Sequence, residues 1–329
     1  MKKFINQVEL VEDQMIQGMV KAYPQYVRKL DCGNVVVRTE KKEGKVALIS
    51  GGGSGHEPAH GGYVGTGMLD AAVAGAVFTS PTPDQIYEGI KAIATDKGVL
   101  MVIKNYTGDV MNFEMAGEMA QMDEIKVAQV VVNDDVAVDG SLYTVGRRGV
   151  AGTVFVHKIA GAKAEEGAEL EEVQRVAQKV IDNVRTMGVA IRPCTVPAAG
   201  KPGFELGEDE MEVGIGNHGE PGTHKEPLRP ADEIVDHILD KNLSDIDYTG
   251  HEVAVMVNSS GATPLMELFI INNHVADVLA AKGIRVYKTY VGEYMTSLEM
   301  EGFSVSLLRL DDELKALLDA HADTIAFKA

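Results

Sequence analysis

The sequence contains no tryptophan, few aromatic residues and few cysteines, and each shortage disfavours a class of protein. With 5% aromatic residues, the chain has little material for stacking on nucleic-acid bases. Its two cysteines, Cys32 and Cys194, are too few for a disulfide scaffold and are typical of a reducing compartment, so we expect a cytoplasmic protein. Acidic residues interrupt the apolar stretch that a signal peptide needs, and no apolar run reaches the ~18 residues of a membrane-spanning helix.

Positive charge is also scarce. The chain has 31 Lys and Arg against 49 Asp and Glu, which gives a formal net charge of −18. Because a phosphate backbone requires a basic surface, we expect no nucleic-acid partner. The hydrophobic content of 45% is typical of a globular protein, and a length of 329 residues suggests two domains.

Apolar runs and amphipathic stretches alternate along the chain. We expect helices over 6–22, 81–94, 112–122, 146–187, 231–241 and 264–281, and strands over 35–37, 45–50, 98–104, 126–132, 252–258, 284–290 and 303–309. Buried strands that alternate with helices predict two α/β domains, each with a largely parallel or mixed sheet and flanking helices. The composition changes near 185–192 and a Pro- and Gly-rich stretch follows, so we assign the domains to residues 1–187 and 188–329.

Two familiar motifs occur in contexts that weaken them. Residues 56–60 (HEPAH) match the zinc-peptidase pattern H-E-x-x-H, which needs a helix to bring both histidines to one face. Pro58 and the flanking glycines leave no room for such a helix, so a zinc peptidase stays a remote alternative and we expect no metal site. Residues 214–219 match G-x-G-x-x-G, but we expect no helix before residue 231, which disfavours a dinucleotide site.

Three polar, glycine-containing loops carry the candidate chemistry. Residues 50–60 and 104–109 follow expected strands, and residues 216–222 form the third loop. In open α/β sheets, ligands bind beyond the carboxyl ends of the strands. The first two loops offer backbone N–H groups together with His56, Lys104 and Asp109, a set suited to polarising a carbonyl or hydroxyl group and moving its proton. The residues alone therefore predict a site for a small polar metabolite.

Eight separated segments resemble the dihydroxyacetone kinase family. They are SGGGSGHEPAHGGYVG (50–65), FTSPTPDQI (78–86), IKNYTGD (103–109), DDVAV (134–138), GRRGVAGTV (146–154), CTVPAAGKP (194–202), GNHGEPG (216–222) and GATPLMEL (261–268). The resemblance covers the whole chain and implies a homodimer whose subunits each hold two α/β domains. Fused, ATP-dependent members carry a further helical nucleotide-binding domain. Because this chain ends at Ala329, it is more similar to the dihydroxyacetone-binding K subunit of the phosphotransferase-system-dependent enzymes.

The resemblance implies phosphoryl transfer to dihydroxyacetone, giving dihydroxyacetone phosphate. In such systems a separate L subunit carries ADP or ATP with Mg, and a phosphocarrier M subunit recharges that nucleotide, so we expect no cofactor on this chain. The acidic composition and the absence of a P-loop motif agree with a chain that holds only the uncharged triose. Other relatives of this size bind dihydroxyacetone and assist a transcription regulator, and this non-catalytic coactivator role is the alternative.

The resemblance also implies roles for individual residues. His218 matches the histidine that bonds covalently to the substrate's carbonyl carbon as a hemiaminal, which selects a ketone or aldehyde over glycerol. His56 and Asp109 match the acid–base pair, and we favour His56 as the proton acceptor although the sequence does not separate the two roles. The expected substrate-binding residues are Gly53, Ser54, Gly55, His56, Lys104, Asp109 and His218.

The remaining polar features have plainer interpretations. We expect the other histidines to be solvated or capping residues: His157, His224, His237, His251, His274 and His321. Arg147 and Arg148 are expected to have a structural or partner-docking role. Asn217, where many relatives have an apolar residue, either hydrogen-bonds the neighbouring imidazole or shapes the turn.

Overall fold

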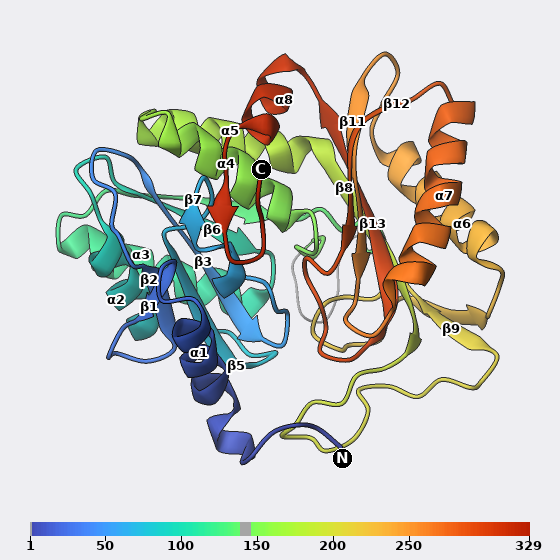
Figure 1. Cartoon of the computed structure of the whole chain (residues 1–329), viewed down its shortest axis with the longest axis horizontal. Helices are drawn as coiled ribbons and strands as arrows, with labels where there is room; N and C mark the ends of the chain where they lie inside the picture. The colour runs from blue at the N-terminus through green and yellow to red at the C-terminus, as the bar shows by residue number, and fades with distance from the viewer. Residues whose placement is uncertain (1, 139–145) are drawn as a thin grey trace.

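The computed structural model describes residues 2–138 and 146–329, which form two six-stranded sheets with layers of helices around and between them (Figure 1). The first sheet has the order β1-β2-β5-β3-β6-β7, and the second has the order β10-β9-β8-β13-β11-β12. This confirms the predicted α/β class with mixed sheets.

The first sheet places its parallel strands at the centre and at one edge. Its strands are β1 (Val27–Lys29), β2 (Val35–Arg38), β3 (Ala47–Ser54), β5 (Ala71–Val77), β6 (Val99–Lys104) and β7 (Val127–Val132). Strands β5, β3, β6 and β7 pair in parallel, whereas β1 and β2 pair antiparallel at the other edge. The carboxyl ends of β5, β3 and β6 therefore lie side by side at the same end of the sheet, where a ligand site is expected.

The second sheet is mostly antiparallel. Its strands are β8 (Val184–Arg192), β9 (Glu210–Val213), β10 (His224–Pro227), β11 (Glu252–Ser259), β12 (Arg285–Gly292) and β13 (Glu301–Leu310). Strand β11 pairs in parallel with β12 and antiparallel with β13, which in turn pairs antiparallel with β8. The boundary expected between residues 187 and 188 falls inside β8, and the division into two independent domains stays a prediction.

Most of the helices form three layers. The helices are α1 (Val11–Ala22), α2 (Pro83–Ile93), α3 (Thr107–Met122), α4 (Thr153–Glu165), α5 (Leu170–Asn183), α6 (Ala231–Asp245), α7 (Leu265–Ala281) and α8 (Asp312–Asp319), with short 3-10 turns η1 (Val8–Leu10) and η2 (Gly61–Tyr63). Helices α2 and α3 cover the outer face of the first sheet, and α6 and α7 cover the outer face of the second (Figure 1). Helices α4 and α5 lie between the sheets, with α8 packed on α4.

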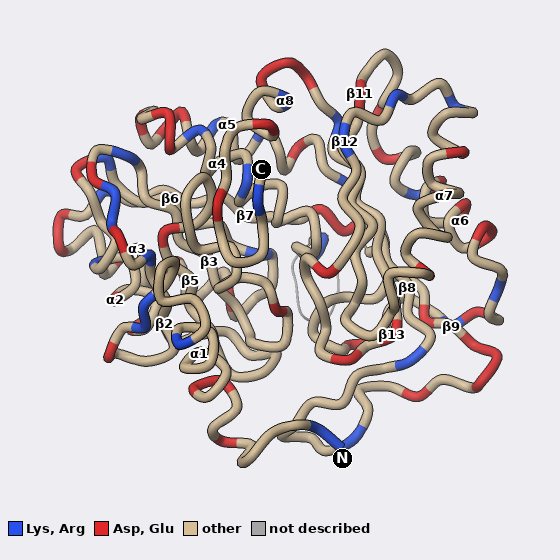
Figure 2. The backbone as a smooth tube through the Cα atoms, in the orientation of Figure 1, with Lys and Arg blue, Asp and Glu red and all other residues tan. Residues whose placement is uncertain are grey.

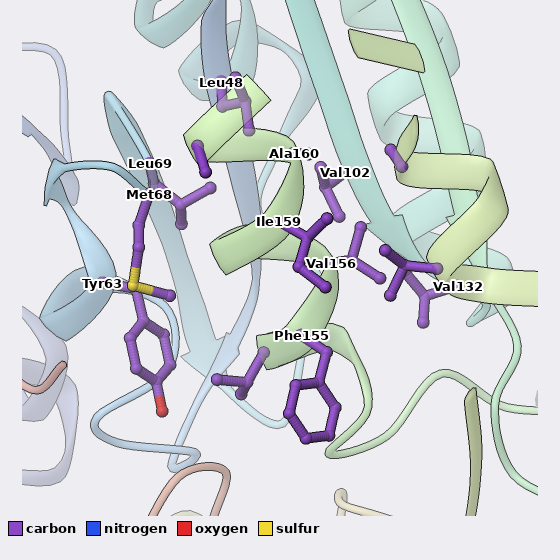
Figure 3. Packing of buried hydrophobic residues seen from close by; sticks show 14 of the residues in the cluster. Leu48, Tyr63, Met68, Leu69, Val102, Val132, Phe155, Val156, Ile159 and Ala160 are labelled. Atoms are coloured by element: carbon purple, nitrogen blue, oxygen red, sulfur yellow. The ribbon is translucent and has the colours of Figure 1, made fainter. Parts of the chain in front are cut away.

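Helix α4 is the centre of the shared core. Eleven of its thirteen residues are buried, so it lacks the polar face of a surface helix. Figure 3 shows Val156 and Ile159 packed near Val102 of the first sheet. The same cluster of buried residues continues to Met256 and Leu308 of the second sheet, so one hydrophobic core joins the two halves of the chain.

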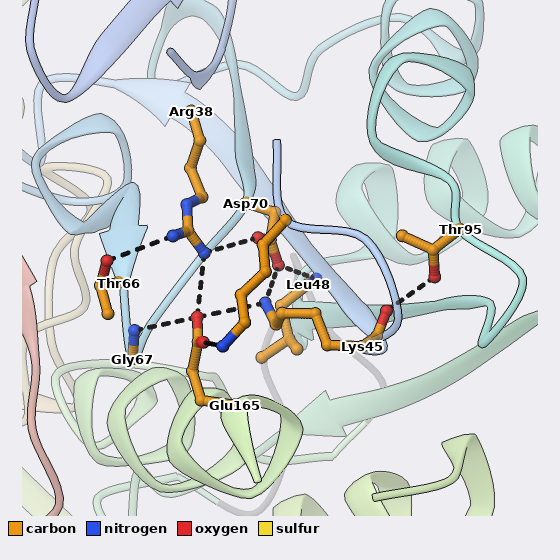
Figure 4. Close-up of polar contacts among 9 residues, drawn as sticks. Arg38, Lys45, Leu48, Thr66, Gly67, Asp70, Thr95 and Glu165 are labelled. Carbon is orange, nitrogen blue, oxygen red and sulfur yellow. Dashed lines mark hydrogen bonds and ion pairs between the residues drawn. The ribbon is translucent and has the colours of Figure 1, made fainter. Parts of the chain in front are cut away.

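A buried group of ion pairs attaches α4 to the end of the first sheet at which the parallel strands β3 and β5 begin (Figure 4). Lys45 Nζ lies 2.6 Å from Asp70, and Arg38 bridges Asp70 and Glu165 at 3.1 and 2.9 Å. Lys45 is 1% exposed, so its charge requires these carboxylates. Because Glu165 is the last residue of α4, the network holds the end of that helix against the sheet.

The segment 146–187, expected as one helix, is two helices followed by a strand. Gly167, at a φ of +82°, ends α4 in the left-handed conformation that favours glycine, and β8 begins at Val184. The expected loop 192–229 contains β9 and β10. Strand β3 continues through the glycine run to Ser54, so residues 50–54 are sheet rather than loop.

The C-terminal segment returns to the first half of the chain. Strand β14 (Asp323–Thr324) pairs with β4 (Gly65–Thr66), and the N–H of Ala326 donates to the carbonyl of Gly62 at 2.9 Å. Within residues 2–138 and 146–329, no helix is long and apolar enough to cross a membrane.

Candidate active site

A cleft of about 580 Å³ opens where the two halves of the chain meet. Its lining residues from the first half are Phe78, Thr79, Ser80, Tyr106, Thr107 and Gly108, and those from the second half are Val196, Gly203, His218, Gly219, Glu220 and Pro221. Residues 78–80 and 106–108 directly follow β5 and β6, so the cleft lies beyond the carboxyl ends of parallel strands.

His218 lies at the wall of this cleft, surrounded by aromatic rings. Its ring centroid is 4.0 Å from that of Tyr106 and 4.8 Å from that of His56, both in edge-to-face geometry. Burial, together with the positive charges of Lys104 and Arg148, holds the pKa of His218 well below its ordinary value. The imidazole is therefore neutral at pH 7 and has a lone pair that can attack an electrophilic carbon.

His56 lies fully buried beside His218 and stacks on Phe78, with ring centroids 5.3 Å apart. Its Nδ1 is 2.9 Å from the carbonyl oxygen of Thr296, and because a carbonyl can only accept, Nδ1 carries the proton. Nε2 then presents a lone pair, and it has no hydrogen-bond partner among the residues that the structure describes. Burial and the charge of Lys104 lower the pKa of His56 well below its usual value, so this nitrogen is a free acceptor.

Lys104 and Asp109 lie together beneath the glycine run. A Cβ added to Gly52 would lie 3.3 Å from both the Lys104 ammonium and a carboxylate oxygen of Asp109. Burial lowers the pKa of Lys104 and raises that of Asp109, and each charge opposes the effect of burial on the other. Within the described chain, neither group has a hydrogen bond of ordinary geometry, although the Ser80 hydroxyl also favours the charged form of Asp109. Buried polar groups left open in this way are suited to a polar ligand.

The predicted glycine-rich residues approach the cleft loop through their backbone. A Cβ on Gly53 would lie 2.5 Å from the Thr79 nitrogen, so no larger residue fits there without moving the backbone. Gly55, at a φ of +102°, lies against the Phe78 ring. The Ser54 hydroxyl donates to the carbonyl of Gly75 at 2.7 Å, so that side chain stabilises the sheet.

Two buried charges hold the His218 loop, and the sequence interpretation missed one of them. The N–H of His218 donates to Glu220 at 2.7 Å, and Arg148 contacts Glu220 at 3.4 Å. Arg148 also donates to Asp135 at 2.7 Å and to the carbonyl of Gly214 at 2.6 Å. Arg148 therefore has a structural role, which is one of the two roles predicted for it. Glu220 lies in the segment GNHGEPG, from which only His218 was predicted to have a role.

Residues 56–60 do not form the helix that a zinc peptidase needs. His60 instead turns to His157 on α4, with 3.0 Å between Nδ1 of His60 and Nε2 of His157. The expectation that His157 is a solvated or capping residue is wrong, because His157 lies within α4 and is fully buried in the layer between the sheets. Over residues 2–138 and 146–329, no three His, Cys, Asp or Glu side chains are grouped to hold a metal ion.

The segment 214–219, which contains Asn217, is a turn rather than a dinucleotide site. The segment 214–219 is followed by extended chain until α6 begins at Ala231, so it lacks the helix of a dinucleotide site. Asn217 donates its N–H to the Tyr106 hydroxyl at 3.4 Å, and its side-chain amide contacts the Met295 sulfur at 3.0 Å. The Asn217 side chain thus faces the second half of the chain.

Comparison with known proteins gives relatives over the full length of the chain. A protein of Listeria innocua, PTS-dependent dihydroxyacetone kinase 1, dihydroxyacetone-binding subunit DhaK, is 55% identical over 329 residues, covering 99% of this chain and 100% of the relative. The PEP-dependent dihydroxyacetone kinase subunit DhaK of Escherichia coli is 44% identical and covers 99% of each chain.

Solved structures with the same fold include both a kinase and a regulator. The dihydroxyacetone kinase of C. freundii has a TM-score of 0.93 at 35% identity, covering 99% of this chain and 60% of the kinase. The dihydroxyacetone kinase operon co-activator Dha-DhaQ has a TM-score of 0.89 at 37% identity, covering 95% of this chain and 97% of the co-activator. The Dak1 domain model matches residues 17–326. The resemblance to the dihydroxyacetone kinases is thereby confirmed, and the chain belongs to the Dak1 domain family.

Proposed function

We propose that this chain is the dihydroxyacetone-binding subunit of a phosphotransferase-system-dependent dihydroxyacetone kinase, and that it captures the triose as a covalent hemiaminal on His218. The observation that carries the proposal is a neutral His218 at the wall of the cleft, next to His56 with an open Nε2 lone pair. The 55% identity to a full-length DhaK subunit supports the same substrate class.

The capture step needs a carbonyl group. A lone pair of the His218 imidazole attacks the carbonyl carbon, and the carbonyl oxygen becomes a hydroxyl group as the imidazole gives up its ring proton. No atom leaves, so the mass of the protein rises by the whole triose, about 90 Da. Glycerol has no carbonyl carbon and cannot react, which gives the site its selectivity.

The transfer step needs a proton acceptor. The terminal hydroxyl of the bound triose attacks the γ-phosphoryl group of a nucleotide, and its proton passes to Nε2 of His56. Lys104 and Asp109, both buried beneath Gly52, hold the hydroxyl groups through hydrogen bonds. Gly53, Ser54 and Gly55 contribute close backbone approach.

The phosphoryl donor belongs to a partner. The sequence has no P-loop motif, and acidic residues occur along both halves of the backbone, which disfavours a nucleotide on this chain (Figure 2). We propose that a separate L subunit brings ADP or ATP with Mg to the open cleft and that a phosphocarrier M subunit recharges it. We further propose a homodimer in the cytoplasm, where the two free thiols stay reduced.

A second candidate function is supported by the likeness to the co-activator Dha-DhaQ. In that role the chain would bind dihydroxyacetone and act on a transcription regulator without phosphoryl transfer. The fold serves both roles equally, so the argument depends on the acid–base residues. His56 and Asp109 are both present and buried next to the cleft. Phosphoryl transfer requires an acid–base pair, whereas a protein that only binds the triose does not. We therefore favour the kinase subunit.

Two measurements test these proposals, one on the purified chain and one on the reconstituted system. Intact-mass spectrometry with dihydroxyacetone should show an added mass of about 90 Da, and glycerol should add none. Phosphoenolpyruvate-driven formation of dihydroxyacetone phosphate should require this chain together with its L and M subunits and the general phosphotransferase proteins. An adduct without any turnover in the complete mixture would favour the co-activator role, and the lack of an adduct would overturn the covalent step.

A further inference from the structure

Tyr106 contacts both His218 and Lys104, and the chemistry proposed above gives it no role. Its ring centroid is 4.0 Å from that of His218, the shortest ring contact of that imidazole in the described part of the chain, and the two planes cross at 83°. The Lys104 ammonium lies 5.3 Å from the centre of the same ring, within the range of a cation–π contact. One aromatic side chain at the wall of the cleft therefore touches two of the proposed ligand-binding groups.

The Tyr106 ring is attached to a rigid part of the first half of the chain. The residue follows β6 directly, and its carbonyl oxygen accepts the N–H of Val110, in the first turn of α3, at 2.9 Å. The preceding residue, Asn105, donates its N–H to Val132 of β7, also at 2.9 Å. Tyr106 is 5% exposed, so its ring is enclosed by other side chains. A ring held at the junction of a strand and a helix is better fixed than one on a loop.

His218, by contrast, lies on a loop, and its ring is held by packing. Its main-chain N–H donates to Glu220 at 2.7 Å, whereas among the described residues no hydrogen bond reaches a nitrogen of its ring. The imidazole can therefore turn about its side-chain bonds unless neighbouring side chains prevent it. Edge-to-face packing favours one angle between two rings, and the nearest ring is that of Tyr106. Attack on a carbonyl carbon needs the nitrogen lone pair aimed at that carbon, so the angle of the imidazole decides whether capture occurs.

The hydroxyl group of Tyr106 contributes less than the ring. It accepts the N–H of Asn217 at 3.4 Å, which is a long hydrogen bond, and the shorter bond from His218 to Glu220 already holds the same loop. Burial raises the pKa of Tyr106 well above its ordinary value, and the charge of Glu220 adds to this effect. The phenol therefore stays protonated at neutral pH and does not act as a base.

We propose that Tyr106 is a positioning residue for the capture of the carbonyl ligand, and that its ring rather than its hydroxyl group performs this role. The ring holds the His218 imidazole at the angle from which a ring nitrogen meets the carbonyl carbon. The same ring stabilises the Lys104 ammonium, which keeps the two ligand-binding groups in one arrangement. The identity of the ligand rests on the proposed function, which this role deepens.

The ring contact can be tested without any ligand. A ¹H–¹³C spectrum of the histidine-labelled full chain reports the imidazole protons, and the His218 signals are assigned from their loss in His218→Ala. The Tyr106 ring shifts these signals through its ring current. We expect the signals to stay in place in Tyr106→Phe, which keeps the ring, and to move in Tyr106→Leu, which removes it. Signals that do not move in Tyr106→Leu would overturn the proposal.

The effect on capture is measured by intact-mass spectrometry as the dihydroxyacetone concentration is raised. In Tyr106→Phe, we expect the concentration that gives half of the adduct to rise by less than about threefold, the scale of one weak hydrogen bond. In Tyr106→Leu it should rise roughly tenfold, the scale of one edge-to-face contact together with a cation–π contact. In the reconstituted kinase, KM should rise by the same factor with kcat within about twofold, because saturating ligand restores the adduct. A fall in kcat without a change in the half-adduct concentration would contradict the positioning role.

Tyr248 provides a matched control in the core of the second half. It is 3% exposed, and its hydroxyl donates to the carbonyl of Leu307 at 3.4 Å, so it resembles Tyr106 in burial and in hydrogen-bond length. It packs in the core of the second sheet and does not line the cleft. Tyr248→Leu should therefore lower the stability of the chain and leave the half-adduct concentration unchanged. Equally weak capture in Tyr248→Leu and Tyr106→Leu would show that loosening of the fold, rather than positioning, is the cause.

A failure of the proposed function gives a different pattern. If the unmodified chain forms no adduct with dihydroxyacetone, the substrate assignment is wrong, and the spectrum still decides whether the Tyr106 ring orients His218. If the unmodified chain and Tyr106→Leu form the adduct equally well, the substrate assignment stands and the positioning role is overturned. If Tyr106→Leu does not fold, Tyr106→Met replaces it, because the flexible methionine side chain fills irregular space. A tenfold loss of capture in Tyr106→Phe would by itself overturn the assignment of the role to the ring.

Discussion

Nδ1 of His56 lies 2.9 Å from the carbonyl oxygen of Thr296, so a backbone atom of the second half of the chain determines the tautomer of a histidine in the first half. The same two segments are joined by the N–H of Leu298, which donates to the carbonyl of Gly55 at 2.7 Å. The proton-accepting nitrogen of the proposed site therefore depends on contact between the two halves. The acid–base chemistry cannot be assigned to either sheet alone.

This arrangement predicts the pH dependence of turnover. Because the pKa of His56 is held well below its ordinary value near 6.5, Nε2 remains an acceptor in mildly acidic solution. A group with a lowered pKa loses function only as the pH falls through that lower value. We therefore expect kcat of the reconstituted system to show no loss with an apparent pKa near 6.5. A decline centred there, absent in the partner subunits, would contradict a buried His56 as the base.

Replacing His218 should abolish covalent capture. His218→Ala removes the nucleophile but leaves the Glu220–Arg148 support of the loop, so the fold is retained and the mass increase of about 90 Da with dihydroxyacetone is lost. His274→Ala, on the outer helix α7, is the matched control and should keep the full adduct. An undiminished adduct in His218→Ala would move the covalent bond to another residue.

Replacing Asp109 should separate binding from turnover. Asp109→Asn keeps the shape of the side chain and removes the negative charge beside Lys104. We expect an adduct of normal yield and a fall in kcat on the order of 10²-fold, as for the loss of a residue in acid–base chemistry. A loss of the adduct with unchanged kcat would reassign Asp109 to substrate binding alone.

The close approach at Gly53 can be tested by adding one methyl group. In Gly53→Ala the new Cβ would lie 2.5 Å from the Thr79 nitrogen, so the strand end or the cleft loop must move. We expect dihydroxyacetone binding to weaken by more than about tenfold, because displacements near 1 Å have large effects on positioned groups. In Gly18→Ala, on helix α1, the added Cβ would have no described heavy atom within 4 Å outside its own helix, so the change should stabilise the protein by about 0.5–1 kcal/mol and leave binding unchanged.

The ion-pair network at the end of α4 predicts how stability depends on pH. Burial alone would raise the pKa of Glu165, but Lys45, Lys42 and Arg38 outweigh it and lower that pKa to about 2. A depressed folded-state pKa stabilises the protein above the unfolded value of 4.5, and this contribution is lost as the pH falls toward 2. Glu165→Gln should therefore cost about 2 kcal/mol at pH 7 and less at pH 4.

Urea unfolding at both pH values measures this difference. Glu118→Gln on the exposed side of α3 is the matched control and should change the free energy of unfolding by less than about 0.5 kcal/mol at either pH. A Glu165→Gln penalty that stayed constant between pH 7 and pH 4 would show that the carboxylate contributes by packing rather than by charge.

The sequence predicted the helices and strands that have strong periodicity, and it failed where tertiary contacts override local preference. Strand β5 (AAVAGAV) has alanine and glycine in place of typical strand residues, and it forms because β2 and β3 pair on both its sides. The glycine run of β3 was expected as loop because glycine destabilises an isolated strand. It is strand because β5 and Lys104 approach too closely for side chains.

The candidate site follows the same division. His56, Lys104 and Asp109 follow two neighbouring parallel strands, and the order of those strands was enough to predict that they meet at the carboxyl ends of the sheet. His218 was assigned only through the family resemblance, and the structure places its ring beside that of His56. The burial of His157 and the pairing of Arg148 with Asp135 and Glu220 were not accessible in this way. Both depend on α4 lying between two sheets, an arrangement of layers that no local pattern encodes.

The return of the C-terminal segment has a consequence for folding during synthesis. Strand β14 and Ala326 contact β4 and Gly62, directly after the residues that carry His56 and His60. The ribosome produces residue 62 long before residue 326, so the first sheet emerges without the segment that covers this turn. The proposed site is therefore completed late in translation, and a nascent chain that stalls before β14 carries the site residues without their support.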